Sequence, residues 1–193
     1  MGKFANVWLA GAMAVMAFSS CAEEKKGYVI DGQVTDVKEG MMYLKKYEGK
    51  SFVDVDSTAI VDGKFKFEGV ASEALAHGLT TIKGSSRPLV FFLDNDAMKV
   101  TMNESGKEMS VVGSEANDIY LRNAKITRSK DYSLDSLLTA HPTSPVAAYF
   151  VVKDFVYKLD LEGMKAVRAK LDASLAGSEY VNQIESMISR MEK

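Results

Sequence analysis

The chain has 193 residues, with 24 Lys and Arg against 26 Asp and Glu, so its formal net charge is −2. This near balance gives no electrostatic reason to expect nucleic acid as a partner. Cys21 is the only cysteine, whereas dithiol redox chemistry needs two cysteines, normally spaced C-x-x-C.

Residues 1–20 predict an export signal. Lys3 gives a positive start, and the apolar run FANVWLAGAMAVMAF follows it. This run is shorter than the roughly 20 apolar residues that span a membrane, and small residues end it. The next residues, FSSC, resemble the lipobox of bacterial lipoproteins, although Phe18 stands where Leu is usual. The resemblance implies that Cys21 is lipidated; the alternative is an ordinary secretory signal with an incidental cysteine.

Residues 21–26 form a charged tether after the predicted cleavage site. Within it, Glu23 and Glu24 resemble the acidic cluster that follows the acylated cysteine in surface-exported lipoproteins of Bacteroidetes. A plain solvated linker explains the same residues equally well. With the lipid anchor, the tether predicts a protein of the cell envelope, held at the outer membrane and facing either the periplasm or the cell surface.

Residues 27–113 carry the signals of β-strands. About eight short apolar segments recur at spacings near ten residues, with turn residues between them. The clearest is the hairpin STAIVDGKFKFEG, in which Asp62–Gly63 suits a type I′ turn and Phe65 and Phe67 share one buried face. The pattern suits an antiparallel sandwich or a partly open barrel, and we expect a sandwich-like antiparallel β domain.

Residues 114–193 change to an apolar period of about 3.6, which predicts helices. Ser144–Pro145 has the chemistry of a helix start, and Asp160 is expected to cap the following helix. The segment VAAYFVVKDFVYKL is apolar on nearly every side, so we expect it at the centre of a helical bundle. The predicted fold class is therefore α+β, a β domain followed by a C-terminal helical bundle.

Four aromatic residues stand close together in the central helical segment. Such side chains can line a ligand pocket or pack in the hydrophobic core, and core packing is the more common role. We therefore expect these side chains in the core: Tyr149, Phe150, Phe155 and Tyr157.

Candidate catalytic groups are few. His77 and His141 are the only imidazoles, and neither stands in a metal-ligand spacing, so we expect no metal and no cofactor. His141 lies in a helix break, which favours a capping or surface role over catalysis. Asp54, Asp56 and Asp62 could cluster for general acid–base catalysis, because strand alternation places the first two on one face. No nucleophile–base arrangement or phosphate-binding glycine loop is visible, so we expect no enzyme.

Asp94, Asn95 and Asp96 lie between two expected strands. A run of carboxylates and amides suggests calcium, but an EF-hand loop also needs a Gly and a distal Glu at fixed offsets. A hairpin turn between the two strands is therefore the favoured interpretation.

Two short motifs are candidates for modification. DST at residues 56–58 and DSL at residues 135–137 resemble the three-residue O-glycosylation acceptor of Bacteroidetes. The resemblance implies Ser57, Thr58 and Ser136 as candidate glycosylation sites. Motifs of this length also occur often by chance.

Longer stretches carry a family resemblance. GYVIDGQV, DSTAIVDGKFKFEG and VVGSEANDIY resemble the N-terminal domain of unknown function in thiol–disulfide oxidoreductase lipoproteins of Bacteroidetes. TSPVAAYFVV resembles the helical segment that follows it there, so the resemblance covers residues 27–193. In longer relatives, a thioredoxin-like domain with a C-x-x-C motif comes next. No catalytic residue of the family is carried over, because the resemblance ends before that domain.

These observations leave functions of different classes open. The first is a lipid-anchored, non-catalytic envelope module that binds a protein or a small ligand. The second is an accessory subunit that docks a separate thioredoxin-like protein, and its support is the family resemblance alone. A hydrolase or isomerase that uses the acidic residues is the third. The expected partners are the membrane, through the anchor, and either a thioredoxin-like or another envelope protein.

The anchor can be tested through the thiol that would be acylated. Cys21→Ala is expected to abolish incorporation of a labelled fatty acid and to move the protein from the membrane fraction to the soluble fraction. Ser20→Ala is the matched control, because it keeps a small residue beside an intact thiol. Labelling that persists in the Cys21→Ala protein would contradict the assignment.

Overall fold

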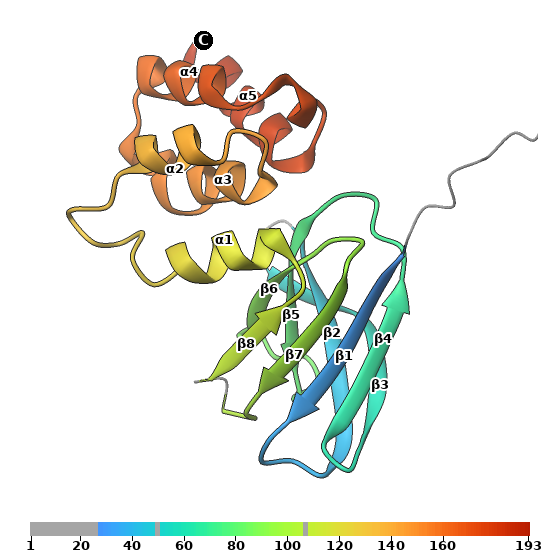
Figure 1. Cartoon of the computed structure of the whole chain (residues 1–193). Coiled ribbons are helices and arrows are strands. Elements are labelled where there is room, and N and C mark those ends of the chain that lie inside the picture. Colours follow the sequence, from blue (N-terminus) through green and yellow to red (C-terminus); the bar gives the residue numbers. More distant parts are fainter. Residues whose placement is uncertain (1–26, 49–50, 106–107) are drawn as a thin grey trace, which may run out of the picture.

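The computed structural model describes residues 27–48, 51–105 and 108–193, so the predicted signal, Cys21 and the tether lie outside the described residues. The strands are β1 (Tyr28–Val34), β2 (Glu39–Glu48), β3 (Ser51–Val61), β4 (Lys64–Gly69), β5 (Leu75–Thr80), β6 (Leu89–Leu93), β7 (Ala97–Met102) and β8 (Met109–Val112). The α-helices are α1 (Glu115–Asn123), α2 (Leu134–Ala140), α3 (Pro145–Phe150), α4 (Leu161–Lys170) and α5 (Glu179–Met191). Figure 1 shows the sheet at one end of the molecule, with α1 between it and the other helices.

The eight strands form one sheet in the order β6-β5-β2-β3-β4-β1-β7-β8, which curls nearly into a barrel. All eight strands contribute to a single interior cluster: Ile30, Val34, Met42, Leu44, Ile60, Phe65, Phe67, Leu79, Phe91, Leu93, Met98, Val100, Met102 and Val111. The mixed architecture of a β domain followed by helices is confirmed. The sandwich-like, wholly antiparallel domain is wrong in detail, because the strands share one sheet and β1 pairs with β7 in parallel.

The Asp62–Gly63 hairpin forms as predicted. Asp62 has φ +50° and Gly63 has φ +76°, the positive values that a type I′ turn requires. Phe65 and Phe67 are both buried in the barrel interior. The ring of Phe65 lies over its cross-strand partner Gly32, where a Cβ atom would come within 2.0 Å of the ring. Gly32 is therefore needed for the phenylalanine to pack.

Beyond this turn, β3 and β4 separate. Val61 and Lys64 are the only residue pair that the ladder between the two strands contains. Each strand then follows a different neighbour, since β3 pairs along its length with β2 and β4 pairs with β1. The barrel wall consequently has a seam between β3 and β4 beyond the turn, where the two strands are not paired with each other.

The opposite gap, between the outer strands β6 and β8, is closed by α1. The side chain of Asn117 in α1 is fully buried beside the outer edge of β6. Its Oδ1 accepts a hydrogen bond from the Phe92 N–H (2.8 Å), and its Nδ2 donates to the Phe92 carbonyl (2.6 Å). One side-chain amide thus satisfies both the N–H and the carbonyl of Phe92, as an added neighbouring strand would do.

The segment of Asp94, Asn95 and Asp96 is not a hairpin turn, and that prediction was wrong. The strands on either side of it, β6 and β7, do not pair, because β6 is an edge strand and β7 lies between β1 and β8. Asn95 exchanges two hydrogen bonds with the backbone of Ala71, and Asp94 accepts one from the Ser114 hydroxyl. The segment therefore connects the edge strand β6 to the inner strand β7 near the start of α1.

The predicted helix caps are confirmed. Ser144 caps α3 with Pro145 in the first turn, and the Asp160 carboxylate accepts from the Gly163 N–H at the start of α4. After α3 the chain passes into a π-helical turn and then a 3₁₀ turn. These turns shift the helical phase, so Tyr157 is 98% exposed and its predicted place in the core is wrong. Tyr149 and Phe150 are buried as expected.

The helices pack against the outer face of β5 and β6. One hydrophobic cluster contains Leu75, Ala76 and Phe92 from these strands together with buried residues of all five α-helices. The Ala76 N–H donates a hydrogen bond to the Tyr180 hydroxyl of α5 (2.9 Å). The helical region and the sheet therefore share a core. Among the residues that the structure describes, no helix is long and apolar enough to cross a membrane.

Asn117→Ala is expected to destabilise the protein by about 3 kcal/mol, because it leaves the Phe92 N–H and carbonyl buried without partners. Urea unfolding of the two proteins measures the difference. Asn123→Ala, the same substitution at the end of α1, is the control and is expected to cost less, because Asn123 is only partly buried. Equal losses from the two substitutions would show that the contact with β6 is not special.

Candidate binding site at the open end of the barrel

A pocket of about 280 Å³ opens at the end of the barrel where β1 begins, and we call it the mouth pocket. It is formed by β1, the middle of β2 and β3, the β4–β5 connection, and the adjoining parts of β5 and β6. The lining residues are Tyr28, Leu44, Lys46, Val55, Asp56, Val70, Ala71, Ser72, Glu73, Leu75, His77 and Leu93.

The floor of the mouth pocket is apolar apart from one imidazole. Leu44, Leu75 and Leu93 are buried there, and His77 is only 8% exposed. The Nδ1 of His77 lies 3.0 Å from the Leu75 carbonyl, which can only accept, so Nδ1 carries the proton. Burial lowers the pKa of His77, and the charge of Lys46 lowers it further. His77 is therefore neutral at pH 7.

The rim of the mouth pocket carries carboxylates. Burial and then the negative charge of Asp56 raise the pKa of the Tyr28 hydroxyl, which places the two groups close together. Glu73 lies on the other side of the pocket, where its Oε2 accepts from the Glu179 N–H of α5 (3.0 Å). This bond caps a helix whose N-cap residue, Ser178, makes no capping bond with its own side chain.

The charges around the mouth pocket do not balance. Burial raises the pKa of the Glu179 carboxyl, Lys46 opposes that change, and the carboxylates of Glu73 and Glu48 add to it. Among the described residues, the pocket lining holds two carboxylates, Asp56 and Glu73, and one cationic side chain, Lys46, while Glu179 lies outside the lining near Lys46, Glu73 and Glu48. The region is acidic overall and retains exposed carboxylate oxygen at Asp56.

The predicted cluster of Asp54, Asp56 and Asp62 does not form. The register of β2 and β3 shifts by one residue, so Leu44 pairs with Asp56 while the next residue, Lys45, pairs with Asp54. Adjacent residues of β2 point to opposite faces, so this bulge sends the two aspartates to opposite faces as well. Asp62 occupies the hairpin turn. The prediction of a shared face was therefore wrong.

Asp54 has a structural partner on the outer face. Its Oδ1 lies 2.5 Å from Nζ of Lys45, whose side chain is 1% exposed, and its Oδ2 accepts from the Gly84 N–H. The hydrogen bond from Lys45 lowers the pKa of the Asp54 carboxyl. The carboxylate therefore neutralises a buried cation and fixes the β5–β6 connection over it.

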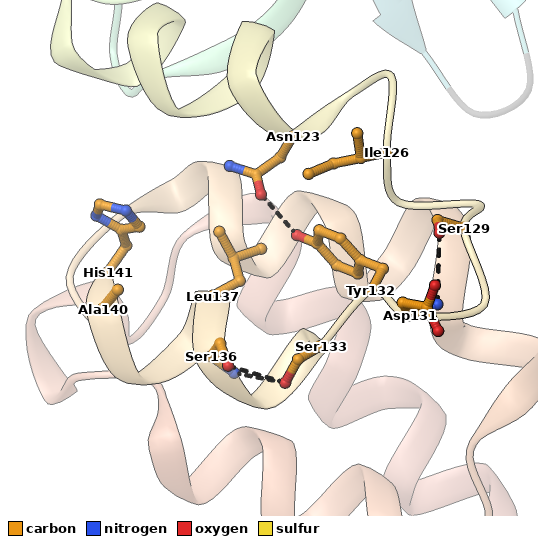
Figure 2. Close-up of a pocket in the computed structure, with 10 residues that line it drawn as sticks. All are labelled: Asn123, Ile126, Ser129, Asp131, Tyr132, Ser133, Ser136, Leu137, Ala140 and His141. Atoms are coloured by element: carbon orange, nitrogen blue, oxygen red, sulfur yellow. Dashed lines mark hydrogen bonds between the residues drawn. The ribbon is translucent and has the colours of Figure 1, made fainter.

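A second pocket, of about 510 Å³, lies in the helical region (Figure 2). The Tyr132 hydroxyl donates to Oδ1 of Asn123 across it, and Ser133 caps α2 through hydrogen bonds from Ser136. His141 stands at one end as the residue that caps the end of α2, as predicted. Within the described chain, no hydrogen bond joins the His141 imidazole to a serine hydroxyl.

The candidate glycosylation residues all reach the surface. Ser57 is exposed and Thr58 is half-buried on β3, and Ser136 is exposed on α2 at the second pocket. Their modification remains a prediction.

The structure is thus a nearly closed β-barrel with a small pocket at its mouth and a packed helical region. Residues 28–120 match the family model of a domain of unknown function, DUF4369, so this domain is present in the chain. The match spans all eight strands and most of α1. No curated protein and no solved structure matches the chain.

His77 gives the site a pH dependence with a definite sign. Because its pKa is lowered in the folded state, the unfolded chain takes up the proton first as pH falls below about 6.5. Its contribution to stability is therefore present at pH 7 and is lost progressively below that value. His77→Gln is expected to flatten the decline in unfolding free energy between pH 7 and pH 5, measured by urea titration.

His141→Gln is the matched control, because it removes the other imidazole and leaves the mouth pocket intact. A His77→Gln protein with the same decline as the wild type would contradict the assignment of a buried neutral imidazole.

Proposed function

We propose that the chain is a non-catalytic binding module of the bacterial cell envelope, anchored through Cys21, and that the mouth pocket binds a Lys or Arg side chain of a partner protein. The observation that carries the proposal is the excess of carboxylates beside an apolar floor: Asp56 and Glu73 line the pocket against Lys46, and Glu179 and Glu48 lie nearby outside the lining. A cationic side chain would correct this imbalance.

The shape of the ligand follows from the same surroundings. Lys and Arg bury their methylene stems on apolar surface while the charged end meets polar groups. Leu44, Leu75 and Leu93 supply that surface, and the carboxylates at the rim supply the polar contact. Neutral His77 does not repel a cation. A volume of about 280 Å³ lies below the usual range for drug-sized ligands, roughly 300–1,000 Å³, and suits one long side chain.

Coulomb attraction is large enough to favour a cation here. Two opposite unit charges about 4 Å apart attract by about 4 kcal/mol at the effective dielectric of a protein surface. Asp56 forms no ion pair within the described part of the chain. A bound cation can therefore pair with its carboxylate without breaking an existing salt bridge. Envelope location is supported by the lipobox resemblance and the acidic tether of the sequence.

The proposal is tested with N-acetyl-arginine amide and its neutral isostere, N-acetyl-citrulline amide, titrated into the lipid-free mature protein and followed by NMR. The arginine compound is expected to shift the amide signals of the mouth pocket and the citrulline compound is not. Asp56→Asn with Glu73→Gln is expected to weaken the arginine contact about tenfold or more, equivalent to about 1.4 kcal/mol.

Asp131→Asn, in the second pocket, is the matched control, because it removes an exposed carboxylate that lines a different pocket, in the helical region. Equal shifts from the arginine and citrulline compounds, or an undiminished affinity in the double variant, would refute the proposed charge recognition.

A further inference from the structure

We infer that a pocket formed by α1, the connection after it, α3 and the π-helical turn binds the phosphate group of a phosphate monoester. The pocket has a volume of about 270 Å³, and we call it the basic pocket. It lies in the helical region, so the inference goes beyond the proposed function, which concerns the mouth pocket. The lining residues are Tyr120, Ala124, Lys125, Arg128, Tyr149, Phe150, Lys153 and Asp154.

The lining of the basic pocket has an excess of positive charge. Among the described residues, it holds three cationic side chains, Lys125, Arg128 and Lys153, and one carboxylate, Asp154. None of the three cations forms a salt bridge within the described part of the chain, although Nζ of Lys153 lies 5.3 Å from the ring centroid of Tyr47. A concave site with cations that no carboxylate neutralises attracts an anionic ligand.

A buried hydrogen bond holds the basic segments of the pocket together. The Thr127 side chain is 2% exposed, and its hydroxyl donates to Oδ2 of Asp154 (2.8 Å). Thr127 lies between Lys125 and Arg128 in the connection that follows α1. Asp154 follows Lys153 in the π-helical turn, a structure that is frequent at functional sites. The bond therefore fixes the two segments against each other and leaves all three cations available.

A tyrosine of the lining supplies a hydroxyl without a hydrogen-bond partner. Tyr149 is 8% exposed, and no hydrogen bond joins its hydroxyl to another described residue. In the same part of the chain, the fully enclosed side-chain atoms that lack a hydrogen bond are Oδ1 of Asp94 and Oγ of Ser178, so the Tyr149 hydroxyl remains accessible. Because Tyr149 lines the basic pocket, a ligand there can accept a hydrogen bond from this buried residue.

Tyr120 supplies a second hydroxyl close to the first. The ring centroids of Tyr120 and Tyr149 lie 6.0 Å apart. Burial and then the charge of Asp154 raise the pKa of Tyr120 to about 12. Burial also raises the pKa of Tyr149, to which the charges of Tyr120 and Asp154 contribute. Both hydroxyls are therefore protonated at pH 7 and can donate to an anion.

Charge and the number of donors favour a phosphate monoester over other anions. This group carries about −1.5 to −2 charges at pH 7 and has three strong acceptor oxygens. It therefore matches an excess of two positive charges, surrounded by a guanidinium, two ammonium groups and two hydroxyls. The guanidinium of Arg128 is suited to bidentate contact with phosphate. A carboxylate has a single charge and two oxygens, so it would leave more of these donors without a partner.

The size of the basic pocket limits what the phosphate carries. A volume of about 270 Å³ lies below the usual range for drug-sized ligands, roughly 300–1,000 Å³. The volume suits a phosphate with a small group such as glycerol. A soluble phosphate monoester and the headgroup of phosphatidate, a phosphate monoester on a lipid, share this chemistry.

The test uses the lipid-free mature protein and NMR at constant ionic strength. Inorganic phosphate and glycerol phosphate are expected to shift the amide signals of Lys125, Arg128 and Lys153 to saturation. Acetate and dimethyl phosphate carry one negative charge each and are expected to bind at least about tenfold more weakly. Arg128→Gln and Tyr149→Phe are each expected to lower the affinity for phosphate about tenfold, because each removes a hydrogen bond to a charged group.

Two matched controls make the same chemical changes outside the basic pocket. Lys130→Gln removes an exposed cation of the same connection, and Tyr157→Phe removes the hydroxyl of an exposed tyrosine. Neither residue lines the pocket, so neither substitution is expected to weaken phosphate binding. Equal losses from Arg128→Gln and Lys130→Gln, or equal binding of phosphate and acetate, would overturn the inference, because either result shows only general attraction of anions. Unchanged affinity in the Tyr149→Phe protein would overturn the site built on the buried hydroxyl.

Vesicles distinguish the two sources of the phosphate group. Binding to phosphatidylcholine vesicles that contain phosphatidate, lost without phosphatidate and lost in Arg128→Gln, would assign the basic pocket to the lipid headgroup. Binding of glycerol phosphate without binding to these vesicles would assign it to a soluble phosphate monoester. Absence of saturable binding to inorganic phosphate, glycerol phosphate and the vesicles would overturn the inference.

Discussion

The paired hydrogen bonds between the Asn117 amide and the backbone of Phe92 hold the architecture together. They satisfy the outer edge of β6 where the barrel would otherwise end, and they fix α1 across the gap to β8. The ring of Phe92 lies in the cluster that the helices share with the sheet, 5.4 Å from the ring of Tyr120 in α1. The Asn117 side chain thus fixes α1 against the edge of β6, and the Tyr180–Ala76 hydrogen bond attaches α5 to β5.

The two gaps of the barrel are treated in opposite ways. Between β6 and β8, a buried amide and a helix remove the free edge. Between β3 and β4, the hairpin pair of Val61 and Lys64 is followed by no further pairing, and the edge remains accessible. Proteins commonly protect free strand edges with covering elements or with charges. Here the only such device on β3 is Asp56, whose carboxylate occupies a single N–H.

Local features of this fold were predictable because short-range chemistry decides them. The positive φ values at Asp62–Gly63 and the caps at Ser144 and Asp160 depend on a few neighbouring residues. The parallel pairing of β1 with β7 and the contact of Glu73 with α5 join distant segments, and no local signal announces them. The separation of Asp54 from Asp56 depends on a one-residue bulge at Val55. Because of the extra residue, two side chains that strand alternation would place on one face lie on opposite faces. The mouth pocket could therefore not be predicted from the sequence.

Glu73 connects the helical region to the charge of the site. A carboxylate at a helix N-terminus is stabilised by the helix dipole and by the free N–H groups there. The bond from the Glu179 N–H therefore holds the Glu73 carboxylate in place beside the mouth, without a cationic partner that would cancel its charge. Glu179, the first residue of α5, adds a second carboxyl, and burial raises the pKa of this group. Repulsion between nearby carboxylates destabilises the unliganded protein, and a cation bound at the mouth would offset that repulsion. The helices can thus be understood as part of the site, since they keep negative charge at the open end of the barrel.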